Sequence, residues 1–322
     1  MVTSFEIENQ TTKERVKFGQ EIDCDFLYKS GGIDWGNAPA THNTYNYPNQ
    51  VGVSISTSKI DTRDVYITAY AFYVMNETEL KNIQRSDWEN YVYSRVKEKK
   101  KKLNDIINPS DYVRIYVGGY YLEGKPQASV KYGTEDTTNN NLFCQFTFQV
   151  YCNNPMFKKD TITRTVLSGD TPAFHFPFIL IPGMLIMGTR IDYLMLAVEN
   201  EGNVSIGGKI ILKASDIVKN PKITNVLTGE TITVKKTMQA GERIVINTVD
   251  GKDRGITGYY KGVEQSYLQY WSFENTWFKF LKGTTLIGYE TENQSENSLD
   301  VSIEINPEKF GLEEEWYEVR DI

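Results

Sequence analysis

Residues 65–74 read VYITAYAFYV and residues 142–152 read LFCQFTFQVYC, and both stretches alternate strictly along their length. One face of the first stretch carries Val65, Ile67, Ala69, Ala71 and Tyr73. The apolar face of the second carries Cys144, Phe146, Phe148, Val150 and Cys152. A period of two is typical of a β-strand that buries one face. These stretches predict two long strands and a fold that is mainly β.

Between these strands the period changes to that of a helix. Asn76 precedes Glu79 with the spacing of a capping box, and Ser86 precedes Glu89 in the same way. Apolar residues follow at helical intervals, at Leu80, Ile83, Trp88, Tyr91, Val92, Val96, Leu103, Ile106 and Ile107. Pro109 then ends the pattern. We expect one long helix, or two abutting ones, over about residues 77–106.

The rest of the N-terminal half is less regular. Residues 5–28 predict one or two strands, whereas residues 31–50 are rich in Gly, Pro, Asn and Thr and predict a long loop. Loops of that length are uncommon in compact domains and usually carry contacts or function. Val51, Val53 and Ile55 then alternate with small residues, which predicts a further half-buried strand.

The C-terminal half contains no helical period of any length. Short strands are predicted at 191–198, 207–214, 223–227, 231–234, 242–248, 255–260 and 302–305, with turn residues between them. This spacing is typical of a β-sandwich or an open barrel. Polar and Gly-containing residues in 153–172 predict a domain boundary. We therefore expect an N-terminal β domain with one helix over residues 1–160 and a β-sandwich over residues 161–322.

Composition excludes several classes of protein. The chain has 322 residues, 40% of them hydrophobic and 24% charged, which is ordinary globular composition rather than disorder. Its 35 basic and 42 acidic residues give a net charge of −7, so bulk charge does not favour nucleic-acid binding. Three cysteines (Cys24, Cys144 and Cys152) without a C-x-x-C spacing suggest neither a disulfide framework nor a zinc site.

Membrane insertion and secretion are not predicted. The most apolar window, residues 174–187, is interrupted by Pro177, Pro182 and Gly183 and is shorter than the ~20 residues that a spanning helix needs. The N-terminal residues lack the basic flank and apolar stretch of a signal peptide. We expect synthesis in a reducing cytoplasm.

Residues suited to catalysis or metal binding are few. His42 and His175 are the two histidines, and no G-x-S-x-G, H-E-x-x-H or P-loop motif accompanies them. The pairs Asp23/Asp25 and Asp61/Asp64 could hold a metal, but aspartates are common at turns and strand ends, and that interpretation is favoured. We predict no catalytic residue, no metal site, no cofactor and no enzymatic activity.

A run of lysines follows within the predicted helix, at Lys97, Lys99, Lys100, Lys101 and Lys102. Like charges at helical spacing repel one another, so something must favour them. A solvated helix face is the favoured interpretation. The alternative is a positive patch that lines a lumen or contacts a neighbouring subunit.

Aromatic residues gather in the last third of the chain. Exposed aromatics can stack on sugar rings, whereas buried ones fill a sandwich core. The core interpretation is favoured, and Trp271, Asn275 and Trp277 are the candidates for a glycan contact.

Several short motifs stand out along the chain: Pro155-Met156-Phe157, Phe176-Pro177-Phe178, the predicted hairpin over 220–233, the stretch GERIVINT at 241–248, and residues 271–283. Together they resemble the distal tail protein (Dit) family of tailed bacteriophages and of phage-derived particles, prophage or tail-like bacteriocin. With the order of elements before them, a strand-rich N-terminal half that carries one helix, the resemblance covers nearly the whole chain.

The resemblance implies a structural protein. In the family, the N-terminal domain forms a ring, usually of six subunits, that joins the tail tube protein to the tail hub or tail-associated lysin. The C-terminal domain is a galectin-like β-sandwich where receptor-binding or peripheral baseplate proteins attach. The expected location is the tail tip or baseplate of a virion or tail-like particle.

A closed ring needs a surface that complements a different surface of the next copy. We predict that Trp35, Val51, Val53, Ile55 and Trp88 contribute to this contact. The alternative function, from another class, is a lectin-like module that binds a glycan on the host cell surface.

Overall fold

The computed structural model describes residues 4–21, 23–135, 138–140, 142–172, 188–192, 195–251 and 253–312. The chain divides into two compact units, and the first takes residues 1–160 while the second takes 161–309. Residues 310–312 group with the first unit again, which differs from the expectation of a second domain that runs on without interruption from residue 161. The physical reason is that the Arg63 guanidinium donates to the Phe310 carbonyl and Leu312 packs against the first core.

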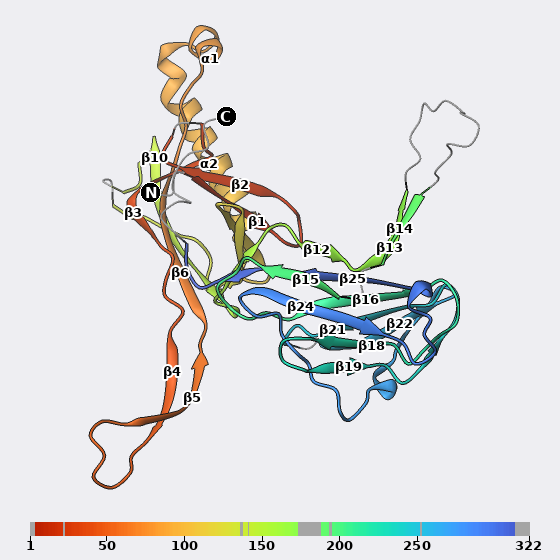
Figure 1. Cartoon of the computed structure of the whole chain (residues 1–322). Helices are drawn as coiled ribbons and strands as arrows, with labels where there is room; N and C mark the ends of the chain where they lie inside the picture. Colours follow the sequence, from red (N-terminus) through yellow and green to blue (C-terminus); the bar gives the residue numbers. More distant parts are fainter. Residues whose placement is uncertain are drawn as a thin grey trace, which may run out of the picture. The chain divides into compact units, whose positions relative to one another are not determined.

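The first unit consists of strands and one helical segment (Figure 1). Its strands are β1 (Ser4–Asn9), β2 (Arg15–Gly19), β3 (Phe26–Asp34), β4 (Ala40–Tyr45), β5 (Ser54–Ile60), β6 (Arg63–Phe72), β7 (Val113–Val117), β8 (Tyr120–Pro126), β9 (Lys131–Tyr132), β10 (Phe143–Cys152) and β11 (Phe157–Lys159). Its helices are α1 (Glu77–Asn82), the 3₁₀ turn η1 (Arg85–Asp87) and α2 (Trp88–Ile106).

The sheet of the first unit closes on itself. Its strands follow the order β11-β8-β7-β1-β2-β3-β6-β10-β9, and β8 also pairs with β10. All these pairs are antiparallel except β2 with β3. Closure leaves a single interior, and the hydrophobic core of the unit lies there.

The two stretches that predicted strands become neighbours, β6 and β10. Their apolar faces meet residue by residue, with Val65 opposite Val150, Ile67 opposite Phe148, Ala69 opposite Phe146 and Ala71 opposite Cys144. Small alanines across from phenylalanine and cysteine leave room for a cluster of rings. The centroid of Phe146 lies 5.3 Å from that of Phe26, and the two rings meet edge to face, a favourable geometry.

The helical segment forms as two helices with a 3₁₀ turn between them. Asn76 caps α1, since its side chain accepts from Glu79 N and its own N–H donates to the Glu79 carboxylate. The second expected capping box does not form: Asp87 is the N-cap of α2, and its side chain makes no capping bond. The buried residues of α2 pack against the core, namely Val92, Val96, Leu103 and Ile106. No helix in the described part of the chain has the length and apolar character needed to cross a membrane.

Strands β4 and β5 form a hairpin, which we call the arm, that continues β3 and β6 outward from the closed sheet (Figure 1). The sequence predicted a loop over 31–50 and a strand over 51–55, and both predictions are wrong in part. Residues 40–45 form β4, and β5 begins only at Ser54. In β4 every residue is exposed. Because neither face is buried, the hairpin lacks the apolar–polar alternation by which strands are predicted.

The second unit consists of short strands and two 3₁₀ turns, η2 (Leu268–Tyr270) and η3 (Glu296–Ser298). The strands are β12 (Thr163–Val166), β13 (Ser168–Pro172), β14 (Gly188–Asp192), β15 (Met195–Asn200), β16 (Gly208–Ala214), β17 (Val218–Lys219), β18 (Lys222–Asn225), β19 (Thr231–Thr233), β20 (Thr237–Met238), β21 (Arg243–Asn247), β22 (Gly255–Tyr260), β23 (Val263–Ser266), β24 (Gly283–Glu290), β25 (Leu299–Ile305) and β26 (Glu308–Lys309).

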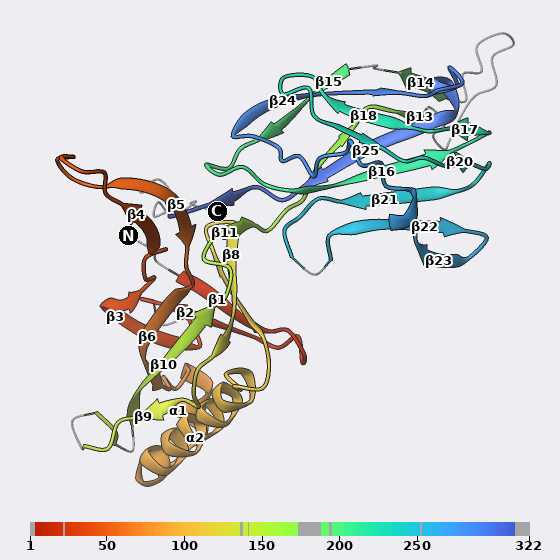
Figure 2. The ribbon, with the colours of Figure 1, turned by 90° about the horizontal axis from the view of Figure 1, so that it is seen from below.

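Two of its sheets enclose one core (Figure 2). The 6-stranded sheet has the order β12-β25-β16-β21-β22-β23 and the 4-stranded sheet the order β15-β24-β18-β19. Ile210 and Ile246 of the first sheet and Ile223 and Ile287 of the second belong to the same buried cluster. This arrangement is the β-sandwich that the C-terminal half predicted.

Candidate assembly interface

The arm exposes large apolar side chains that nothing in the described chain covers. Val51 is 100% exposed, and Val53 and Ile55 are 55% and 56% exposed. The rings of Tyr45 and Tyr47 lie beside them, 5.1 Å apart and edge to face. The arm and helix α2 lie at opposite ends of the first unit (Figures 1 and 2). The end of the arm is therefore an apolar tip held away from the core.

The five residues predicted for a ring contact do not lie together. Val51, Val53 and Ile55 are at the tip of the arm. Trp35 directly follows β3, where the chain leads into the arm, and it packs against the core. Trp88 joins the two helices, because its indole N–H donates to the Ile83 carbonyl over 3.0 Å. The prediction of a contact thus stays open for the tip, while the two tryptophans already have internal partners.

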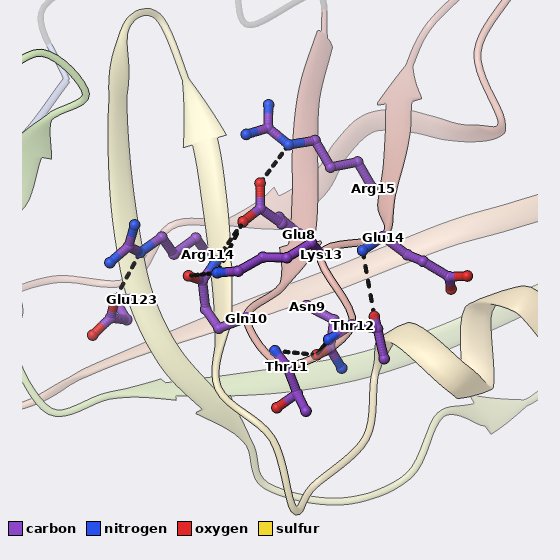
Figure 3. A network of polar contacts seen from close by, with 10 residues as sticks. All are labelled: Glu8, Asn9, Gln10, Thr11, Thr12, Lys13, Glu14, Arg15, Arg114 and Glu123. Atoms are coloured by element: carbon purple, nitrogen blue, oxygen red, sulfur yellow. Dashed lines mark hydrogen bonds and ion pairs between the residues drawn. The ribbon is translucent and has the colours of Figure 1, made fainter.

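A row of charged side chains, which we call the charged row, crosses β2, β1, β7 and β8 (Figure 3). Strand register places Arg15 opposite Glu8, Glu8 opposite Arg114, and Arg114 opposite Glu123. Charge alternates along the row, so every residue has an opposite charge as its lateral neighbour. Cross-strand pairs of opposite charge stabilise a sheet.

Glu8 is the most enclosed member of the charged row. Its side chain is only 8% exposed, and it forms ion pairs with Arg15 and, at 3.8 Å, with Lys13. The Gln10 amide donates to the same carboxylate over 3.0 Å. The guanidinium of Arg15 in turn lies 4.6 Å from the centroid of the Tyr116 ring. The row satisfies its own charges and needs no partner to do so.

The lysine run divides into two groups. Lys99 donates to the Asp25 carbonyl over 2.8 Å, and Lys100 donates to the Asn139 side chain over 3.2 Å. Burial lowers the pKa of Lys99, with the nearby charge of Lys102 as a smaller contribution. Lys97, Lys101 and Lys102 are exposed. Lys99 thus ties α2 to the segment before β3, and Lys100 ties it to the segment between β9 and β10. The other three lysines are left to form a solvated face or to meet a partner.

The residues considered for a glycan contact also have internal partners. Trp271 and Trp277 stack on each other with centroids 3.8 Å apart, and both pack against the second core. The Asn275 amide oxygen accepts from Thr233 N and its NH₂ donates to Thr233 O, both over 2.8 Å. A glycan contact by Asn275 stays a prediction that would require these bonds to break.

A polar cleft of about 590 Å³ lies on the second unit. It is lined by Asn220, Lys222, Thr233, Lys235, Glu290, Thr291 and Glu292. Lys222 pairs with Glu290 at 2.6 Å, and Glu292 accepts from Lys219 and Asn220. Hydrogen bonding from Lys219 lowers the pKa of Glu292. The carboxylates of the cleft are thus neutralised by neighbouring side chains.

The residues considered for chemistry are dispersed. His42 shares a hydrogen bond of 2.8 Å with Ser58 across the arm, and His175 lies outside the described residues, as does Phe176-Pro177-Phe178. Asp23 pairs with Lys17, and Asp25 accepts from the Lys17 backbone. Within the described ranges no three His, Cys, Asp or Glu residues gather as metal ligands.

Sequence reasoning missed Tyr45 and Tyr47 as candidate contact residues. They lie in the segment read as a loop, where an aromatic pair among Gly, Pro and Asn residues was the available signal. Exposed tyrosines are enriched where proteins meet. Together with Val51, Val53 and Ile55 they complete the tip.

No family model matches the chain, and no curated protein matches it. Among solved structures, the chain is similar to the Dit protein (gp 19.1) of phage SPP1, described as a paradigm of the hub adsorption apparatus in phages that infect Gram-positive bacteria. The TM-score is 0.59 at 12% identity, over 94% of this chain and 98% of that one.

Two structures of the phage P2 baseplate in its activated conformation, with Ca and with Sr, also match. Their TM-scores are 0.41 and 0.38, at 14% and 13% identity, over 94% and 95% of this chain and 98% of each of those chains. The likeness to SPP1 Dit confirms the fold that the resemblance of the sequence motifs implied.

Proposed function

We propose that the chain is a structural protein of a phage tail tip or baseplate, or of a phage-derived tail-like particle, and that its first unit assembles into a ring. The fold supports this, since its likeness to SPP1 Dit extends over nearly the full length of both chains. The observation that carries the proposal is the arm, whose tip is apolar and exposed. No enzymatic step and no cofactor form part of it.

An isolated two-stranded hairpin is at best marginally stable in water. The arm continues β3 and β6, but in the described sheets its own strands β4 and β5 pair only with each other, so no third strand supports them. Each valine or isoleucine side chain that moves from water into an interface contributes about 1.5–3 kcal/mol when fully buried. Exposed apolar side chains do not stabilise the lone chain, whereas their burial would stabilise a contact with another protein. The tip is therefore better suited to docking than to folding.

The partner that we propose for the tip is a neighbouring copy. An arm that contacts a different surface of the next copy makes a head-to-tail interface, which closes into a ring when the rotation fits. We propose a ring of six copies, which joins the tail tube protein to the tail hub or tail-associated lysin. The second unit, a galectin-like sandwich in this proposal, anchors receptor-binding or peripheral baseplate proteins.

The test is the assembly state of the purified full chain and its place in a particle. Light scattering and negative-stain microscopy should give six-fold rings, and antibodies against the chain should label the tail tip of particles. A chain that stays monomeric at every accessible concentration and is absent from tail tips would falsify the proposal.

A further inference from the structure

The root of the arm is where β3 passes into β4 and β5 passes into β6. A cavity of about 160 Å³ lies there, lined by residues 35–38, Arg63, Phe157 and residues 310–312. All of these residues belong to the first unit. The root is the part of the arm that packs against the core, since β4 itself is exposed throughout.

Arg63 is buried at the root without a carboxylate among the contacts that the structure describes. The residue is 3% exposed, and its guanidinium lies 4.7 Å from the centroid of the Phe157 ring. Nη1 donates to the Trp35 carbonyl over 3.4 Å, Nη2 donates to the Phe310 carbonyl, and Nε has no hydrogen-bond partner. Burying a charge without an opposite charge is costly. An apolar side chain would serve the stability of the core better, so this arginine calls for another explanation.

Gly36 brings the two strands of the root into backbone contact. A Cβ atom at this position would lie 2.1 Å from the Asp64 carbonyl oxygen and 3.1 Å from its carbon. The residue also has φ +62°, a conformation that glycine adopts without strain. Its N–H donates to the Asp34 carboxylate over 2.8 Å. Only glycine allows residues 34–36 to cross Asp64 this closely.

Trp35, the residue before Gly36, is anchored in the core. Its ring lies 5.8 Å from that of Phe5 and 6.0 Å from that of Phe157. The Trp35 side chain is thereby fixed by packing, and its carbonyl is fixed by Arg63. Both strands of the arm are thus tied to the body of the unit within a few residues.

We infer that the root is a lock that holds the arm in one direction, and that Gly36 and Arg63 are its positioning residues. Arg63 joins Trp35 on the outgoing strand to Phe310, so the lock also includes the segment that follows the second unit. A preorganised arm loses less conformational entropy on docking. The inference deepens the proposed function, on which its purpose rests, since a ring needs every arm to point the same way.

The test measures the direction of the arm in the full chain. Spin labels at Val51→Cys and Glu98→Cys place one probe on the tip and one on α2, both at exposed positions. The native thiols Cys24, Cys144 and Cys152 are buried, so labelling is selective. Pulsed electron–electron double resonance measures the distance between the two labels. At a dilution where light scattering shows monomer, it should give one narrow distance peak.

Arg63→Met should lose that narrow peak while the thermal unfolding midpoint stays the same or rises, because the substitution removes a buried unpaired charge. Gly36→Ala should also lose it. Gly31→Ala is the matched control, since Gly31 has φ +78° but open space around its Cβ position, and it should keep the narrow peak.

A folded Arg63→Met or Gly36→Ala chain with an unchanged narrow peak would overturn the lock. If one of the two variants fails to fold, the other decides. The distance width does not depend on ring formation: a narrow peak that broadens in both variants supports the lock even if no ring is found. If folded variants with a broad peak still formed rings, the proposed function would stand. The fixed direction of the arm would then not be required for assembly, and the purpose that we assign to the lock would be wrong.

Discussion

The charged row and the arm both belong to antiparallel strands of the first unit, but the side chains of the row have partners within the chain and those of the arm's tip do not. In the charged row, Glu8 lies between Arg15 and Arg114, with oppositely charged residues in register. In the arm, Val51, Val53 and Ile55 face water without cover. A surface that satisfies its own groups has no need of a partner, whereas an uncovered apolar tip does. The difference supports the arm as the assembly surface that we propose.

The largest effect is expected at the arm. The triple substitution Val51→Ser, Val53→Ser and Ile55→Ser should abolish ring assembly, because it removes the apolar area of the tip. The unfolding midpoint of the monomer should change little, since these side chains are already exposed. Light scattering measures assembly. Val74→Ser is the matched control, since Val74 is 54% exposed and lies outside the arm; equal loss of assembly in this control would contradict a specific role for the tip.

The tryptophan pair of the second unit resembles the charged row, because its side chains already have contacts within the chain. We expect it to contribute to stability rather than to binding. Trp277→Ala should lower the free energy of unfolding by roughly 2 kcal/mol, less than a fully buried ring would, because Trp277 is partly buried against Trp271. Denaturant unfolding measures this loss.

A glycan array should give no saturable binding to the unmodified chain. Phe273→Ala is the control for the denaturant unfolding of Trp277→Ala. Phe273 is fully exposed, so its replacement should change the free energy of unfolding little. Saturable sugar binding that disappears in a folded Trp277→Ala chain would establish the lectin alternative instead.

Within the charged row, the enclosed carboxylate should matter more than the open one. Glu8→Gln should lower the free energy of unfolding by about 2 kcal/mol, because it leaves Arg15 and Lys13 without their anion. Glu123→Gln should cost less than about 1 kcal/mol, because the Glu123 side chain is 36% exposed. Equal losses, measured by denaturant unfolding, would mean that enclosure does not strengthen the row.

The smallest effect concerns the pH dependence of stability at Lys99. Burial lowers the pKa of Lys99 in the folded chain, so the unfolded chain binds more protons between that lowered pKa and the ordinary lysine pKa. Stability should therefore rise with pH across this window and level off on either side of it. Thermal unfolding at several pH values measures the rise. Lys99→Gln should remove it, whereas Lys101→Gln, at an exposed position, should leave the pH profile parallel to that of the unmodified chain.

The sequence predicts the parts of the fold whose residues have a buried face. Strands β6 and β10 alternate because one face of each lies in the core, and Asn76 caps α1 as its spacing predicts. The arm could not be predicted in this way, because a strand with two exposed faces carries no apolar period. The contacts of Lys99 and Lys100 could not be predicted either, since their acceptors lie 74 and 39 residues away along the chain.

Of the candidate interface, the sequence supplied Val51, Val53 and Ile55, and the structure added Tyr45 and Tyr47 beside them. Arg63 and Gly36 gave no sequence signal, because their roles depend on which backbone groups lie next to them in space. Local patterns identify residues that share a face of one element; they cannot identify a residue whose partners come from three separate segments.

The alternating signs of the charged row also set how far its electric field reaches. Arg15, Glu8, Arg114 and Glu123 sum to zero charge, and opposite neighbours cancel each other within a short distance of the surface. Salt screens what remains within about 10 Å at 0.1 M ionic strength. These four charges therefore contribute little attraction or repulsion toward a macromolecule that approaches from a distance.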